Sequence, residues 1–121
     1  MNNTRLTGNH AEDAVCSILE RRGYRILARN YVVHNVGELD IVAESDNEIF
    51  VFEVKSRILR KNNSFGSPEA AVTYSKQRKI YRTALYFIEK HGFYERNVSF
   101  LAVSARFDKD GLIQNVEFIP F

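Results

Sequence analysis

The chain has 121 residues, of which 45% are hydrophobic and 26% are charged, with a net charge of +2. This composition fits one domain with a real core, spanning residues 1–121, and excludes disorder as its main state. So small a net charge gives only weak support for a polyanion partner. No apolar run approaches the length of a membrane span, so we expect a cytoplasmic protein without a membrane partner.

The first third of the chain predicts a helix followed by a strand. Residues 1–8 are polar, and we expect them to be flexible. Apolar residues recur at helical spacing over 9–22: Ala11, Ala14, Val15, Ile18 and Leu19. Glu12 lies about 90° from the centre of that stripe, at the border of core and solvent, where a solvated carboxylate is the simpler interpretation. Residues 24–33 read as a strand.

Two β-rich runs, 37–43 and 49–57, flank a polar turn and predict a hairpin. If Asp46 and Asn47 form a two-residue turn, Asp40 lies opposite Glu53, and Glu38 lies opposite Lys55. These four side chains would then share one face of the sheet. A three-residue turn would instead shift the pairing by one residue and send Asp40 to the other face.

Two facing carboxylates about 4.5–5.5 Å apart repel each other unless a cation lies between them. An all-oxygen pair such as Asp40 and Glu53 suits Mg²⁺ (or Mn²⁺) better than zinc. Lys55, about 6.6 Å further along the same face, would reach a phosphate or an attacking water. The alternatives are a solvated strand end or an ion-pair ladder, which contributes only about 0–1 kcal/mol and gives little reason to place four charges beside the apolar run 49–52.

The second half of the chain predicts a loop, a helix and two strands. A basic loop covers 58–66, and a helix capped by Ser67 and Pro68 runs to Lys90, with a possible break near Thr73. Strands follow over 98–105 and 112–119. The order is therefore α-β-β-β-α-β-β, an α/β fold whose mixed sheet contains one right-handed parallel crossover. Cations that could contact nucleic acid cluster in two places: Arg57, Arg60 and Lys61, then Lys76, Arg78, Lys79 and Arg82.

An acidic residue on a first helix, an Asp on one strand and Glu-x-Lys on the next resemble the PD-(D/E)-x-K nuclease superfamily, most closely its Holliday-junction-resolvase branch. More specifically, the chain resembles the YraN-like family of small bacterial proteins. The segments that carry this resemblance are 8–12, 27–31, 37–43, 51–57 and 65–72, followed by Lys76. The likeness extends over about residues 8–105. The family commonly has an Asp where this chain has Leu101.

The resemblance implies a restriction-endonuclease-like fold and a metal-dependent nuclease, presumed to act on DNA. Asp40 and Glu53 would hold Mg²⁺ with the Val54 carbonyl, Glu12 would hold a second ion or its water shell, and Lys55 would activate the attacking water. Glu38 would support Lys55. The candidate backbone contacts to nucleic acid are Arg57, Arg60, Lys61 and Lys76. The alternative is a catalytically silent nucleic-acid-binding or adaptor protein that retains the fold. Resolvase-like enzymes also make a homodimer a possible assembly.

Overall fold

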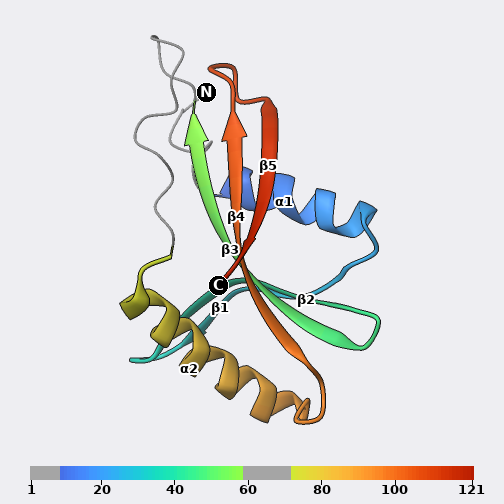
Figure 1. Ribbon diagram of the computed structural model, residues 1–121, viewed down its shortest axis with the longest axis vertical. Coiled ribbons are helices and arrows are strands. Elements are labelled where there is room, and N and C mark those ends of the chain that lie inside the picture. Colours follow the sequence, from blue (N-terminus) through green and yellow to red (C-terminus); the bar gives the residue numbers. More distant parts are fainter. Residues whose placement is uncertain (1–8, 59–71) are drawn as a thin grey trace.

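The described residues, 9–58 and 72–121, form a five-stranded sheet with two helices in the computed structural model (Figure 1). In chain order the elements are α1 (Asn9–Arg21), β1 (Arg25–Val33), β2 (Gly37–Ser45), β3 (Glu48–Ile58), α2 (Tyr74–His91), β4 (Val98–Phe107) and β5 (Ile113–Pro120). The predicted α/β class and element order are confirmed. None of the described helices is long and apolar enough to cross a membrane. The predicted flexible segment 1–8, most of the basic loop and the cap at Ser67 and Pro68 lie outside the described residues.

The strands lie in the sheet in the same order as in the chain. Neighbouring strands are antiparallel except β3 and β4, which are parallel and are connected through α2. A parallel pair needs such a crossover, because a short turn can only reverse the chain direction. The predicted crossover between the third and fourth strands is therefore confirmed.

The turn between β2 and β3 sets the register of the central hairpin. Asp46 and Asn47 both adopt left-handed backbone conformations, with φ of 50° and 66°. Asp and Asn tolerate this conformation better than other residues with a side chain, which is why they form two-residue hairpin turns. Ser45 pairs with Glu48, and the ladder continues without a shift to Ile41 opposite Phe52. The predicted register is confirmed as far as Ile41 and Phe52, and a three-residue turn is excluded.

Two separate hydrophobic cores lie on the two faces of the sheet. The core under α1 includes Val15, Leu19, Ile41, Phe52 and Phe107. The core under α2 includes Leu39, Val42, Val51, Ile80 and Phe87. Because β3 contributes to both cores, its run 49–52 is apolar on both faces, as an interior strand requires.

The sheet divides beyond the last hairpin pair, Ile41 and Phe52. From there β2 continues only with β1, as far as Gly37, while β3 continues only with β4, as far as Ile58. Figure 1 shows β1 and β2 in the lower half of the molecule, and the ends of β3 and β4 with the start of β5 in the upper half. We call this division the sheet fork. The residues just past it, Asp40 and Glu53, are two of the predicted site residues.

The turn of the chain at Asp40 produces the sheet fork. Leu39 packs in the core under α2 and Ile41 in the core under α1, although strict alternation would place both on one face. Asn30, which lies between the β1 residues paired with Ile41 and Leu39, has a left-handed backbone with φ of 51°. The two neighbouring strands are therefore irregular at the same level, and β2 leaves β3 there.

The start of α2 is fixed by caps and by a close contact with β2. Thr73 caps the helix, its Oγ1 accepting a hydrogen bond from the backbone N–H of Lys76 at 3.2 Å. Gly37, at the start of β2, lies so near the helix that an added Cβ would be 2.5 Å from the Thr83 hydroxyl oxygen. Only glycine allows this approach, so α2 lies directly against the strand that carries Asp40.

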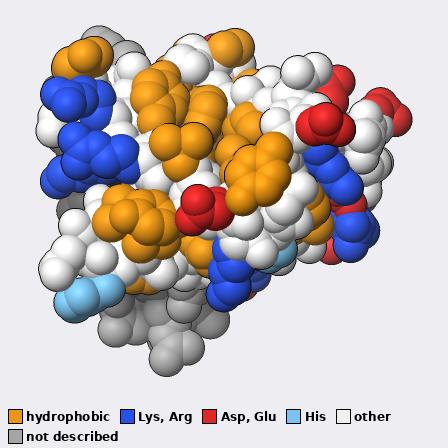
Figure 2. Space-filling model, turned by 90° about the horizontal axis from the view of Figure 1, so that it is seen from below, with side chains coloured by type: hydrophobic (Ala, Val, Ile, Leu, Met, Phe, Trp, Pro, Cys, Tyr) orange, Lys and Arg blue, Asp and Glu red, His pale blue; other side chains and the backbone are white. Residues whose placement is uncertain are grey.

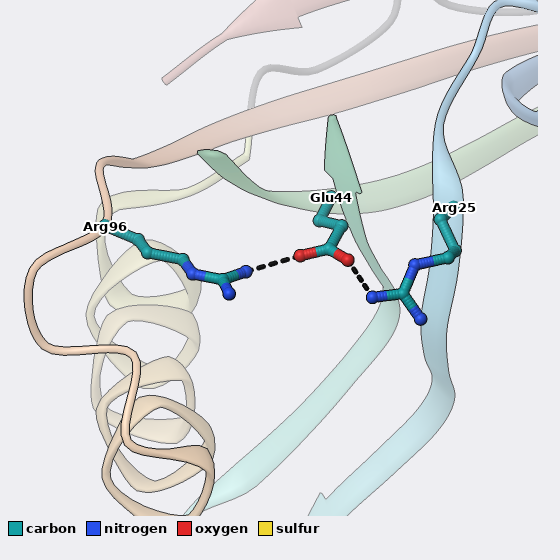
Figure 3. A network of polar contacts seen from close by, with 3 residues as sticks. All are labelled: Arg25, Glu44 and Arg96. Atoms are coloured by element: carbon teal, nitrogen blue, oxygen red, sulfur yellow. Dashed lines mark hydrogen bonds and ion pairs between the residues drawn. The ribbon is translucent and has the colours of Figure 1, made fainter. Parts of the chain in front are cut away.

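A three-residue ion-pair network ties down the turn end of the hairpin (Figure 3). Glu44 of β2 accepts hydrogen bonds from Arg25 of β1 and from Arg96 in the α2–β4 connection. The guanidinium of Arg96 also lies 4.2 Å from the centre of the Phe93 ring. One carboxylate thus joins two strands to the loop that follows α2.

We expect Glu44→Gln to destabilise the protein by roughly 1 kcal/mol at pH 7, because it removes charge from two partly exposed pairs. The hydrogen bond from Arg25 holds the pKa of Glu44 below its usual value of 4.5. Its contribution is therefore present above about pH 4.5 and is lost as the pH falls through the lowered pKa. Urea unfolding of both proteins across this range would check the prediction. A difference that persists unchanged in strong acid would contradict it.

Candidate functional site

Two carboxylates occupy the sheet fork and replace the missing strand pairing. The backbone N–H of Val54 donates to Asp40 Oδ2 at 2.9 Å, and the backbone N–H of Asp40 donates to Glu53 Oε2 at 3.3 Å. Across the gap, Asp40 thus binds the amide of the residue after Glu53, and Glu53 binds the amide of Asp40 itself. The predicted pair, Asp40 and Glu53, is brought together as the register required. The fork itself was not predicted.

Glu53 is a buried acid with an unusual proton affinity. Its residue is 2% exposed, and burial together with the charge of Asp40 raises its pKa from 4.5 to about 7. Burial also raises the pKa of Asp40, while the N–H of Val54 and the charge of Lys76 oppose that rise. Buried acids with raised pKa values are concentrated at functional sites, because ordinary cores avoid them.

Among the residues that the structure describes, the cation in contact with this pair comes from the first turn of α2. Lys76 Nζ lies 3.6 Å from Glu53 Oε1, and its charge lowers the pKa values of both acids. The sequence assigned Lys76 to nucleic-acid contact and gave no reason to expect this ion pair. The direction of the Lys76 side chain depends on the Thr73 cap and on the packing of α2 against β2. That packing is a tertiary feature.

Beyond Glu53, the face of β3 and β4 turned away from α1 is polar. Val54, Ile58, Ala105 and Phe107 belong to the α1 side, so the alternating positions face the other way. These positions are Lys55, Arg57, Ser104 and Arg106. In the described part of the chain, α2 packs mainly on β1 and β2. The core under α2 includes Val51 of β3 and Ala102 of β4, but none of these four positions. Lys55 and Arg57 therefore lie on the same side of β3 as Glu53, as predicted.

The structure does not bring Glu12 into the carboxylate pair. Glu12 Oε1 accepts a hydrogen bond from Asn30 Nδ2 at 3.0 Å and lies 3.5 Å from Arg29 Nη2. Within residues 9–58 and 72–121, no three His, Cys, Asp or Glu side chains are close enough to share one ion. Glu12 instead contacts β1 at Asn30, the residue that lies level with Asp40 in the neighbouring strand. No role for Asn30 was predicted from the sequence, because no residue pattern indicated its left-handed backbone.

Glu38, Leu101 and two of the loop cations also need to be placed. Glu38 pairs with Val32 of β1, and no ion pair of the described residues joins it to Lys55, because the sheet has already divided there. Leu101 pairs with Phe52 and packs on the α1 side, whereas Glu53 lies on the other face. Arg60 and Lys61 lie outside the described residues.

The donor set fits a small, hard divalent cation. Each carboxylate uses one oxygen for a backbone N–H, which leaves Asp40 Oδ1 and Glu53 Oε1 to face a cation. The ammonium group of Lys76 already lies opposite Glu53 Oε1. Mg²⁺ is commonly held by one or two carboxylates together with waters and substrate oxygens, so two acids suffice.

We expect Glu53→Gln to change how stability depends on pH in the absence of metal. The folded pKa of Glu53 lies above its ordinary value, so its proton stabilises the fold below about pH 4.5, and this contribution is lost as the pH rises through about 7. Between pH 5 and 8 the wild type should therefore lose on the order of 2–3 kcal/mol more than the variant. Urea unfolding in EDTA measures this difference. Equal losses would show that Glu53 titrates normally.

We expect Lys76→Met to destabilise the metal-free protein by roughly 1–2 kcal/mol at pH 8, because a buried carboxylate loses its cation. At pH 5, where Glu53 is protonated, the effect should nearly vanish. Lys79→Met, an exposed lysine of the same helix, is the matched control and should change stability by less than about 0.5 kcal/mol. An equal effect of the two substitutions at pH 8 would rule out the ion pair as the cause.

Comparisons with known proteins identify the family. Residues 11–109 match the "Uncharacterised protein family UPF0102". A UPF0102 protein of Clostridium perfringens strain 13 is 38% identical over 112 residues, which is 93% of this chain and 88% of the relative. One from Fusobacterium nucleatum is 39% identical over 114 residues, covering 94% and 92% of the two chains.

Two solved structures also show a weak likeness. One is an fdxN element excision controlling factor protein from Anabaena variabilis, with a TM-score of 0.38 and 14% identity over 88% of this chain and 96% of that one. The other is an XisH family protein from Nostoc punctiforme, with a TM-score of 0.38 and 19% identity over 90% and 98%. The sequence relatives are much closer, and through them this chain belongs to the UPF0102 family, the YraN-like family that its sequence segments indicated.

Proposed function

We propose that this protein is a metal-dependent nuclease that hydrolyses phosphodiester bonds of DNA in a resolvase-like manner. The observation that carries the proposal is the pair formed by the half-buried Asp40 and the buried Glu53 in the sheet fork, with Lys76 3.6 Å from Glu53. Among the described residues, Lys76 is the cation within ion-pair distance of these two acids. Two acids with so little compensating charge are costly to a fold, and a divalent cation would offset that cost.

The carboxylates and the amide edge of β3 would hold the cation. Val54 turns its N–H towards Asp40, and in a strand the carbonyl of the same residue points to the same side. That carbonyl would therefore face the fork as a third oxygen ligand. A bound Mg²⁺ or Mn²⁺ would supply Lewis-acid chemistry, lowering the pKa of a water and stabilising charge on the phosphate.

The remaining residues would position the substrate. Lys55, two residues beyond Glu53 on the same face, would orient the attacking water and offset phosphate charge. Arg57 would contact the DNA backbone further along this face, with Arg60 and Lys61 following it in the chain. Lys76 would exchange Glu53 for a phosphate when the cation is bound. Glu12, through Asn30, would hold β1 beside Asp40.

A homodimer is the assembly that we include in this proposal. Leu85 and Tyr86 are exposed apolar side chains, and they line a cavity of about 260 Å³ with Glu89. Analytical ultracentrifugation of the wild type and of Leu85→Glu would test whether this surface joins two copies. A monomeric wild type would remove the homodimer from the proposal and leave the site unaffected.

Binding of a divalent cation can be tested without any substrate. We expect Mg²⁺ or Mn²⁺ to raise the melting temperature of the wild type, because a ligand that binds only the folded state stabilises it. At 100 times the dissociation constant the gain is about 2.7 kcal/mol. Asp40→Asn should abolish the gain. A stabilisation that survives in Asp40→Asn would place the cation elsewhere.

Cleavage of labelled duplex, single-stranded, flap and four-way-junction DNA tests the activity itself. Wild type with Mg²⁺ or Mn²⁺ should cut at least one substrate, whereas Asp40→Asn, Glu53→Gln and Lys55→Ala should each lower the rate by at least about 100-fold. Cutting that survives these substitutions would overturn the proposed site. If the protein binds DNA equally well with and without metal but does not cut it, it is instead the catalytically silent adaptor.

A further inference from the structure

The outward side of the first two turns of α2 carries a groove that the proposed chemistry does not use. The groove has a volume of about 180 Å³ and is lined by Tyr74, Ser75, Arg78, Lys79 and Arg82. Three of these five side chains are cations, one is aromatic, and none is acidic. Such a lining is complementary to an anion that also presents a flat apolar surface.

Tyr74 is exposed in a way that packing does not explain. It is 75% exposed, and the guanidinium carbon of Arg78 lies 5.8 Å from the centre of its ring. The buried residues of α2, among them Ile80, Ala84 and Phe87, face the sheet instead. The ring of Tyr74 is therefore offered to solvent beside a row of positive charge.

The row of positive charge follows the helix. Tyr74, Arg78 and Arg82 are spaced four residues apart, so they lie along one side of α2. Figure 2 shows the face that includes α2, with Lys and Arg side chains gathered at the left, where α2 begins, and hydrophobic side chains over the middle. The positive charge thus extends over about one turn, from Arg78 to Arg82, which is about 6 Å of helix.

The groove and the carboxylate site lie on opposite sides of the first turn of α2. Lys76, in the same turn as Tyr74, reaches across to Glu53. Residues two apart on a helix point in directions about 200° apart, so this turn presents Lys76 to the sheet and Tyr74 to solvent. A strand that contacts both would therefore have to pass around this turn of the helix.

We propose that this groove binds an unpaired nucleic-acid strand, with a base stacked on Tyr74 and phosphates held by Arg78, Lys79 and Arg82. Aromatic stacking together with a cationic track is the usual way in which proteins hold single strands. A duplex keeps its bases stacked inside and offers only phosphates, so it would leave Tyr74 without a partner. The link from the groove to the carboxylates rests on the proposed function, whereas the binding itself does not.

Fluorescence anisotropy in EDTA tests the groove with the full chain and no cleavage. The probes are a labelled single-stranded oligothymidylate of about 20 nucleotides and a blunt duplex of the same length. We expect Tyr74→Ala to weaken single-strand binding about tenfold and to leave duplex binding within about twofold. Tyr74→Phe keeps the ring and should bind as the wild type does. Tyr94→Ala removes a tyrosine that is 68% exposed outside the groove and is the matched control.

The cations are tested by salt dependence. Arg78→Ala and Arg82→Ala should each lower the slope of log affinity against log salt by about 0.7 for the single strand, because each removes one phosphate contact. Arg21→Ala, an exposed arginine at the end of α1, should leave the slope unchanged.

The results separate this inference from the proposed nuclease. Single-strand binding that is insensitive to Tyr74→Ala, or an equal loss for single strand and duplex, overturns the groove. If the protein binds single strands through Tyr74 yet cuts no DNA, the groove proposal is supported and the nuclease proposal is refuted. A protein whose cutting requires Asp40 while Tyr74→Ala binds normally keeps the nuclease and loses the groove.

Discussion

The end of the β2–β3 ladder at Ile41 and Phe52 is the constraint on which the rest of the structure depends. Past that pair, the backbone amides of Asp40 and Val54 have no strand partner within the hairpin. A buried amide must still find an acceptor. The side chains of Asp40 and Glu53 provide the acceptors: Asp40 accepts from the amide of Val54, and Glu53 accepts from the amide of Asp40. The sheet can divide here because these positions carry acids, so the acids serve the fold as well as the proposed chemistry.

The two ends of the hairpin show what distinguishes a structural charge from a candidate functional one. At the turn end, one carboxylate, Glu44, is paired with two arginines, and its pKa is lowered. At the fork, two carboxylates have Lys76 as their nearest cation, and their pKa values are raised. The first arrangement is electrostatically satisfied. The second favours protons or added cations, and this is the property expected of a site that binds a metal ion.

Most of the fold could be predicted from local pattern. The Asp46-Asn47 turn set the register, and the apolar periodicities located both helices and all five strands. The fork could not be predicted in this way, because extending the hairpin register is the natural assumption, and it placed Glu38 opposite Lys55. The actual partner of Glu38 depends on β1, with which β2 remains paired after leaving β3. Similarly, the spacing of α2 revealed its cations but not that Lys76 turns towards Glu53.

The first turn of α2 connects the two halves of the proposed function. Thr73 caps this turn, Gly37 allows the helix to lie against β2, and the resulting orientation sends Lys76 inward and Tyr74 outward. Lys76 contributes stability only while Glu53 is ionised and no other cation neutralises it. A cation at the fork would therefore release Lys76 for contact with a substrate phosphate. The same turn that stabilises the metal-free fold would then present an added positive charge to the phosphate, without any rearrangement of the sheet.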